Sequence, residues 1–572
     1  MNLLALGAAL FCSSVGASST GTLVEAHIEA PETVDPAWAF GAESEHLIGS
    51  VYDKLLDFEG SSVDRLEPRL SMKVPSQENG FISKDSLTYR FPIRQGVRFH
   101  DGTLLTPEDV RYSLLRFMFM DRLGGPSALL LEPVIGETST LGRKPPEELL
   151  ARAERAITVD GGSLVIRLKR PFSPLLALLA HVGYVQSKSW CAAHGSWDGT
   201  PRGLEGFARP RYEANPINGI ENGTGPFTLE RWDKAAQAIY LKRFDGYWRT
   251  PAALERVVWR VVPDFNTRKL MLQSGDADIA YLPPELEALA YGDDRDVVLG
   301  PFPRPVVTLI YFGAKLEAGG NPNIGSGKLD GQGIPPDFFT DRDVRLAFAY
   351  ALDTASYARE ALKGKAKLAR GVVPSALFDY KDLPSVHFDL DQAREHLRLA
   401  WKGLAWERGF HFEIDYTAGN QQRENLARMI KRNLESLNPK ISIDVRGVLP
   451  ATLVSRQHAN FLPLDLGSWA ADYPDPHAVV SFLLGSKIQG RSYRDPAMDA
   501  LIERAARSSG AARRGAYEEL HQRWLSEMPI LALLEPLGLR WQRRVVEGFV
   551  FNPMYPGAPV HSDYYRLSKT AP

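Results

Sequence analysis

Alternating apolar and polar side chains predict a β-strand at residues 87–97, in the segment LTYRFPIRQGV. The turn-forming residues 99–102 follow, and Thr106 and Pro107 then have the residue types that begin a helix, with acidic residues in its first turn. The same reading predicts further strands at residues 23–28, 164–168, 223–229, 238–242 and 254–262.

Apolar residues at helical spacing predict an amphipathic helix at residues 343–353, with one apolar face formed by Val344, Ala347, Phe348, Ala351 and Leu352. Other helices are expected at residues 267–273, 391–401, 422–437, 496–507 and 512–527, and an exposed loop at 319–336. The sequence contains no internal repeat with a period of 20 to 50 residues, so a repeat architecture is not expected. The chain is therefore expected to be α/β or α+β, with mixed sheets and more than one lobe.

Length and composition narrow the class of protein. A chain of 572 residues with 44% hydrophobic and 24% charged residues is expected to fold into two to four units. The 67 Lys and Arg against 69 Asp and Glu argue against a protein that coats nucleic acid or anionic membrane through bulk charge. With 11 Trp, 20 Tyr and 26 Phe, an intrinsically disordered chain is excluded.

The N-terminus has the pattern of an export signal. Residues 3–11 form an apolar run too short to span a bilayer, and Val15 and Ala17 precede a cleavage point before Ser18. We expect residues 1–17 to be a signal peptide, although no Lys or Arg precedes the run; a buried N-terminal element is the alternative. Lipid attachment at Cys12 is disfavoured by the bulky Phe11, and cleavage would leave Cys191 as the sole cysteine.

Five motifs in collinear order resemble the family 5 extracellular solute-binding proteins, the oligopeptide, dipeptide and nickel receptors of ABC importers. They are the strand, turn and helix at 87–116 and the segments at 223–248, 254–283, 338–353 and 467–476, the last of which reads GSWAADYPDP. Each motif alone is weak evidence for this family, but the five motifs in the same order are specific to it. The Gly223-Thr224-Gly225 turn lacks the lysine of a phosphate-binding loop, and His100 of the FHDG turn is expected to be structural.

The resemblance implies an α/β fold of the two-lobed periplasmic-binding-protein type, a type II-like clamshell with an extra inserted domain and mixed β-sheets flanked by helices. It places lobe I at residues 18–46, 170–263 and 534–572, the inserted domain at 47–169 and lobe II at 264–533. The chain would cross between the lobes near Pro263 and Leu533. Closure of such lobes buries a ligand between them.

The resemblance also implies ligand-binding residues in the loop after the last motif strand. Asp472 occupies the place of an aspartate that holds the α-ammonium of a peptide, and Tyr473 follows it. A turn-capping role is the alternative for Asp472, as is expected for Asp475. Trp469 would line a side-chain pocket, or else belong to the core.

Three further residues are candidates for ligand contact. Arg456 lies near the position of a family arginine beside the ligand, with a solvated arginine as the alternative, and Glu43 and Glu45 lie in an early loop where some members place an acidic group. At residues 124–131, where a peptide receptor places a tyrosine against its ligand, the chain has no aromatic residue. That departure puts a peptide contact from the inserted domain in doubt.

No enzyme motif emerges from the sequence. It contains no HExxH, no CxxC, no G-x-S-x-G and no pair of histidines at metal-ligand spacing, so no catalytic residue, cofactor or metal is expected. The sequence thus predicts a periplasmic, monomeric receptor that delivers a peptide-type solute to an ABC permease and binds no nucleic acid. A nickel chelate, sugar or opine-like cargo on the same fold, an envelope hydrolase, and a sensory partner of a membrane receptor are the alternatives.

Overall fold

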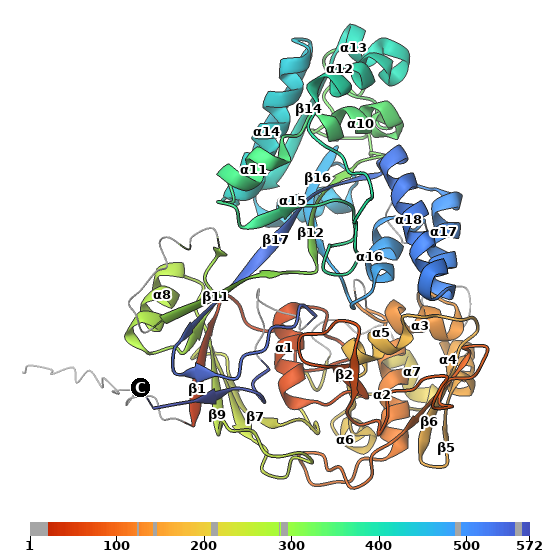
Figure 1. Ribbon diagram of the computed structural model, residues 1–572, viewed down its shortest axis with the longest axis vertical. Helices are drawn as coiled ribbons and strands as arrows, with labels where there is room; N and C mark the ends of the chain where they lie inside the picture. The colour runs from red at the N-terminus through yellow and green to blue at the C-terminus, as the bar shows by residue number, and fades with distance from the viewer. Residues whose placement is uncertain are drawn as a thin grey trace, which may run out of the picture.

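A ten-stranded sheet connects the two lobes of the protein in the computed structural model (Figure 1). The structure describes residues 21–122, 125–140, 146–207, 215–284, 287, 296–486, 493–554 and 563–571. The strand order is β16-β12-β17-β10-β1-β9-β8-β7, and β11 and β13 also pair with β17. We call residues 21–303 together with the chain after 536 the lower lobe, and residues 306–534 the upper lobe, as they lie in Figure 1.

The lower lobe combines part of this sheet with a smaller sheet of order β4-β6-β5 and with the pair β2–β3. Its strands are β1 (Thr22–His27), β2 (Leu56–Phe58), β3 (Leu66–Pro68), β4 (Thr88–Pro92), β5 (Ile157–Asp160), β6 (Ser163–Arg167), β7 (Phe227–Asp233), β8 (Ala238–Arg243), β9 (Arg256–Val261), β10 (Ile279–Ala280), β11 (Asp296–Pro303), β18 (Val546–Glu547) and β19 (Ser568–Lys569). Its helices are α1 (Ala42–Val51), α2 (Pro107–Phe119), α3 (Ala128–Ile135), α4 (Pro146–Ala156), α5 (Leu175–Val182), α6 (Lys188–Ala193), α7 (Pro201–Phe207) and α8 (Phe265–Ser274).

The upper lobe contains the remaining strands of the large sheet, the parallel pair β14–β15 and most of the later helices. Its strands are β12 (Val306–Phe312), β13 (Ala366–Leu368), β14 (Phe410–Thr417), β15 (Ile441–Val448), β16 (Leu464–Ala470) and the first part of β17 (Ile530–Arg543). Its helices are α10 (Arg342–Tyr350), α11 (Thr354–Glu360), α12 (Leu390–Leu399), α13 (Leu404–Arg408), α14 (Gln421–Leu437), α15 (Pro450–His458), α16 (Pro476–Leu483), α17 (Pro496–Arg507) and α18 (Gly510–Glu527).

Two chain segments pass between the lobes. Strand β17 pairs with β12 over residues 530–534 and with β11 over residues 537–543, so it runs through both. The second passage is the short link from β11 to β12, at Arg304 and Pro305. The sequence placed a crossing near Pro263, but α8, β10 and β11 stay with the lower lobe because β10 pairs with β1 and β11 pairs with the lower part of β17.

The predicted elements are largely present, with differences at their ends. Thr106 forms a capping box with Asp109 at the start of α2, and Gly275 ends α8 at a φ of 87°. The strand predicted at 87–97 ends at Pro92, since proline has no N–H for a ladder and Gly96 turns the chain at a φ of 79°. The helix predicted at 343–353 ends at Tyr350, and Asp353 instead caps α11.

Helix α1 is fixed to the lower sheet through its apolar face and its last turn. Leu47 and Val51 pack in one buried cluster with Leu23 of β1. Gly225 donates its N–H to the carbonyl of Val51 at 3.1 Å, and a Cβ on Gly223 would lie 1.9 Å from that same oxygen. The glycines of the GTG motif therefore allow close backbone packing against the end of α1.

The FHDG turn has the structural role expected of it. Nδ1 of His100 lies 2.8 Å from Glu221, and Nε2 lies 3.1 Å from the carbonyl of Gly225. The expected signal peptide and Cys12 lie outside the described residues, and Cys191 is a buried free thiol. In the part of the chain that the structure describes, no helix is long and apolar enough to cross a membrane.

Candidate functional site

Two carboxylates, one from each lobe, approach each other where the lobes meet. Asp472 follows β16 in the upper lobe, and Glu45 projects from α1 in the lower lobe. Burial and the charge of Asp472 raise the pKa of Glu45 to about 8, and burial raises the pKa of Asp472 to about 7. Because the two pKa values exceed the usual range of carboxyl groups, this site disfavours negative charge unless a cation enters it.

Among the described residues, the charge of Lys54 lowers the pKa of Glu45, and no cation lowers the pKa of Asp472. Glu45 lies 3.5 Å from Nε2 of His181, but burial lowers the pKa of His181 to about 3, so its imidazole is neutral at physiological pH. Lys54 is paired with Asp57 at 3.1 Å. No hydrogen bond to the Asp472 carboxylate is formed by the residues that the structure describes, whereas Asp475 accepts from the backbone of His477 and caps α16.

An arginine missed by the sequence analysis lies beside Asp472. Val306 pairs with Ala470, and the N–H of Ala471 donates to the carbonyl of Pro305 at 2.9 Å, so Arg304 and Asp472 are the next residues along the two chains. Burial lowers the pKa of Arg304, and among the described residues no carboxylate compensates its guanidinium. Its place in the link between β11 and β12 became apparent only from the strand pairing.

Strand β16 offers backbone groups next to these charges. It pairs with β12 on one side and with no other strand in the described part of the chain, so it forms one edge of the large sheet. Ser468 and Ala470, at the end that leads to Asp472, are exposed. An extended chain can add to such an edge through main-chain hydrogen bonds.

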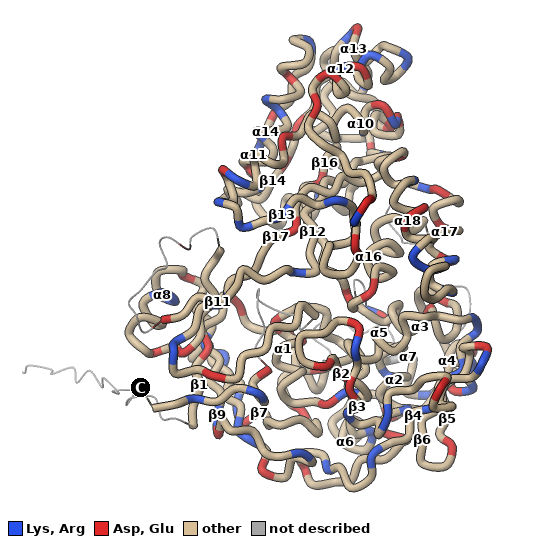
Figure 2. The backbone as a smooth tube through the Cα atoms, viewed as in Figure 1, with Lys and Arg blue, Asp and Glu red and all other residues tan. Residues whose placement is uncertain are grey.

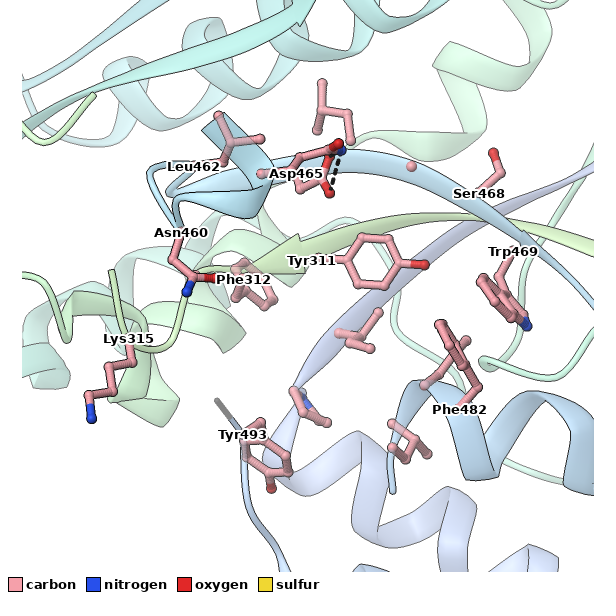
Figure 3. A pocket seen from close by; sticks show the side chains of 18 of the residues that line it. Tyr311, Phe312, Lys315, Asn460, Leu462, Asp465, Ser468, Trp469, Phe482 and Tyr493 are labelled. Carbon is pink, nitrogen blue, oxygen red and sulfur yellow. Dashed lines mark hydrogen bonds between the residues drawn. The ribbon is translucent and has the colours of Figure 1, made fainter. Parts of the chain in front are cut away.

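The indole of Trp469 connects this edge to a cavity of about 450 Å³ in the upper lobe (Figure 3). Its ring stacks on Phe482 at 3.6 Å between centroids, and its Nε1 is buried with no hydrogen-bond partner among the described residues. Tyr311, Lys315 and Tyr493 line the same cavity, which has both apolar and polar walls. Asp472 and Glu45 do not line it, so the cavity continues the site only on the Trp469 side.

The other three sequence candidates have partners within their own lobes. The hydroxyl of Tyr473 lies 2.7 Å from Nδ1 of His477, and its ring is buried. Arg456 of α15 forms an ion pair with the buried Asp415. Glu43 faces away from Asp472 into the lower lobe, where it lies 3.0 Å from Nδ1 of His27.

Two solute-binding proteins are similar in sequence to this chain over most of its length. Di/tripeptide-binding protein 2 of Pseudomonas aeruginosa (strain UCBPP-PA14) is 26% identical over 545 residues, which cover 92% of this chain and 91% of that protein. The glutathione-binding protein GsiB of Escherichia coli (strain K12) is 27% identical over 415 residues, which cover 72% of this chain and 67% of that protein.

Solved structures share the fold over nearly the whole length. The periplasmic binding protein DppA from Helicobacter pylori, in complex with the peptide STSA, gives a TM-score of 0.72 at 21% identity, covering 96% of this chain and 98% of that one. NikZ from Campylobacter jejuni, in complex with Ni(L-His), gives a TM-score of 0.70 at 17% identity, and the match covers 96% of this chain and 100% of that one.

The family model of the bacterial extracellular solute-binding proteins, family 5, matches residues 73–491, well over half of the chain. This extent agrees with the two-lobed α/β fold and with the five collinear motifs. The chain belongs to the bacterial extracellular solute-binding proteins, family 5.

Proposed function

We propose that this protein is the substrate-binding component of an ABC importer and that it encloses a peptide-type solute with a free amine and a free carboxylate between its lobes. The observation that carries the proposal is the pair Asp472 and Arg304. Their charges are opposite and their chain segments are adjacent. Among the described residues, Asp472 has no compensating cation, and Arg304 interacts with Tyr281 but with no carboxylate. A zwitterion supplies a cation for the first and an anion for the second, which removes two costly uncompensated charges.

The remaining features suit the other parts of a peptide. The free edge of β16 can pair with an extended backbone, and the cavity beyond Trp469 can hold a side chain. The di/tripeptide-binding relative supports this cargo. Figure 2 shows Lys and Arg interspersed with Asp and Glu over both lobes, which suits selectivity that depends on a few buried groups.

The proposal extends to the cellular setting and to the domain organisation. Residues 1–17 would be removed on export to the periplasm, and the receptor would act as a monomer that meets the permease, performs no catalysis and binds no nucleic acid. Lobe I would comprise residues 18–46, 170–303 and 537–572, with the inserted domain at 47–169 and lobe II at 304–536, once the first crossing is moved to Arg304.

Titration calorimetry with chemically defined peptides tests the proposed cargo. We expect di- and tripeptides with free termini to bind, and the same peptides with an acetylated amine or an amidated carboxyl to bind much more weakly. Equal binding of the blocked and free forms would contradict the zwitterion assignment. Binding of a metal chelate or a sugar in place of every peptide would favour the alternative cargo.

Replacing Arg304 with Gln is expected to weaken binding of a free-acid peptide roughly tenfold or more, because hydrogen bonds to charged groups contribute about 1.5–3 kcal/mol each. Binding of the matching C-terminal amide should change little, since it has no charge to lose. The measurement is calorimetry on both ligands, with Arg359→Gln as the control because that side chain is 66% exposed. Equal losses for acid and amide would remove Arg304 from the carboxylate role.

The facing carboxylates also predict how pH affects closure of the unliganded protein. When the lobes are together, the pKa values of Glu45 and Asp472 are raised, so both carboxyl groups keep protons that they would release if the lobes separated. Low pH therefore favours closure, and a rise in pH through about 7 to 8 disfavours it. We expect small-angle scattering to give a larger radius of gyration at pH 9 than at pH 6. The double variant Glu45→Gln and Asp472→Asn should lose this dependence, and a radius that changes equally in both proteins would contradict the prediction.

A further inference from the structure

Three side chains with metal-ligating groups meet inside the lower lobe. His27 is the last residue of β1, and Glu43 and His46 lie three residues apart on one face of α1. One ligand atom from each residue lies within 4.8 Å of the others, and Nδ1 of His27 is 3.0 Å from Oε2 of Glu43. The side chains of all three are buried.

We propose that His27, Glu43 and His46 bind a divalent transition-metal ion of the zinc type. Two imidazoles and one carboxylate are a common ligand set for Zn²⁺, and a water molecule can complete a tetrahedron. The ion takes the place of the proton between His27 and Glu43. Tetrahedral bonds of about 2.0–2.2 Å place ligand atoms roughly 3.4 Å apart, so the widest separation, at most 4.8 Å, would have to shrink by as much as about 1.4 Å.

The second nitrogen of His27 faces a carboxylate, at a distance longer than a hydrogen bond. Nε2 is buried, forms no hydrogen bond to the described residues, and lies 3.8 Å from Oε1 of Glu25. Glu25 is in turn held by the hydroxyl of Tyr564 at 2.6 Å, and the His27 ring stacks on Trp259 at 3.5 Å. A carboxylate placed behind a histidine orients the ring and increases its basicity as a ligand.

The charge balance around the trio also favours a cation. Glu25 and Glu43 are two buried carboxylates, and the guanidinium of Arg540, which interacts with Glu25, compensates one of them. Glu43 has no Lys or Arg partner among the described residues, and a bound metal ion would compensate it.

A small cavity borders the trio at His46. His46 lines this cavity of about 70 Å³ together with Glu45 and Gly49 of the same helix. The trio is distinct from Asp472 and Arg304, so metal binding and solute binding can fail independently. The site was not predictable from the sequence, because His27 comes from a separate strand that only the fold brings to Glu43 and His46.

Titration of chelator-treated full-length protein with Co²⁺ and then Zn²⁺ tests the proposal. We expect one Co²⁺ per chain with the visible absorption of tetrahedral coordination, displacement by one Zn²⁺, and an X-ray absorption spectrum with two imidazoles around zinc. His46→Gln and Glu43→Gln should weaken binding by more than tenfold, and Glu25→Gln by about 10–100-fold, since it removes the group behind His27. His194→Gln, at an exposed histidine, should have no effect.

The outcomes decide whether the trio binds a metal ion. If Glu25→Gln is folded by near-UV circular dichroism and binds Co²⁺ as the unaltered protein does, the assignment of the site is wrong. Stoichiometric Co²⁺ that persists in folded His46→Gln would likewise overturn it. Absence of a site tighter than micromolar in the unaltered protein would refute the proposal.

Discussion

Replacing Asp472 with Asn is expected to weaken binding of a peptide with a free amine by about 30-fold or more. Removing one partner of a buried, hydrogen-bonded charge pair costs about 2–5 kcal/mol, and 1.4 kcal/mol corresponds to a factor of ten. The side chain keeps its size, so the loss reports the charge. Calorimetry on a tripeptide with free termini gives the affinity of both proteins.

The matched ligand is the same tripeptide with an acetylated amine, which carries no cation for Asp472. Asp472→Asn should change its affinity by much less than that of the free peptide. Asp444→Asn serves as the control variant, because that side chain on β15 is 61% exposed. Equal losses for the free and acetylated peptides would mean that Asp472 does not bind the amine.

The affinity for a free-amine peptide is expected to be highest between about pH 7 and 8. Below pH 7 the raised pKa of Asp472, about 7, means that a proton must leave before the ammonium binds. Above about pH 8 the peptide amine is itself neutral and must take up a proton. Because Asp472 is already half protonated at pH 7, the affinity should fall roughly 15-fold from pH 7 to 5.5 and approach a tenfold fall per pH unit at lower pH.

Calorimetry at several pH values measures this pH profile. Variants and a blocked peptide show which group causes its acid limb and which its alkaline limb. Asp472→Asn should flatten the acid limb, whereas an N-acetylated peptide should flatten both limbs. Glu45, with a pKa of about 8, is mostly protonated at pH 7 and therefore leaves the negative charge on Asp472. An acid limb that persists in folded Asp472→Asn would assign it to another group.

Most of the fold could be predicted because it depends on local patterns. The capping residues of α2 and the apolar spacing of α14 and α17 are visible in neighbouring positions, and these elements appear close to their predicted bounds. The passage at Arg304 was not predictable in this way. It depends on which strands pair over long sequence separations, and β10 and β11 pair with β17, more than 230 residues later.

The candidate site, like the fold, was predictable from the sequence only in part. The motif around Asp472 identified a loop, and Glu45 was a candidate from its place in the chain. Arg304 belongs to no motif, and its importance comes from a buried guanidinium that no carboxylate compensates among the described residues. Tyr473 and Arg456 have the residue types of ligand contacts, but His477 and Asp415 already occupy their polar groups.

The central claim is that the lobes enclose a peptide with free termini. Native mass spectrometry of the protein purified without denaturation, followed by release and sequencing of its ligand, tests this claim most directly. We predict a set of mass increments that correspond to short peptides with free termini, and their absence from Asp472→Asn. A single metal complex, a glycan or another ligand without an amine, retained equally by the variant, would contradict the account.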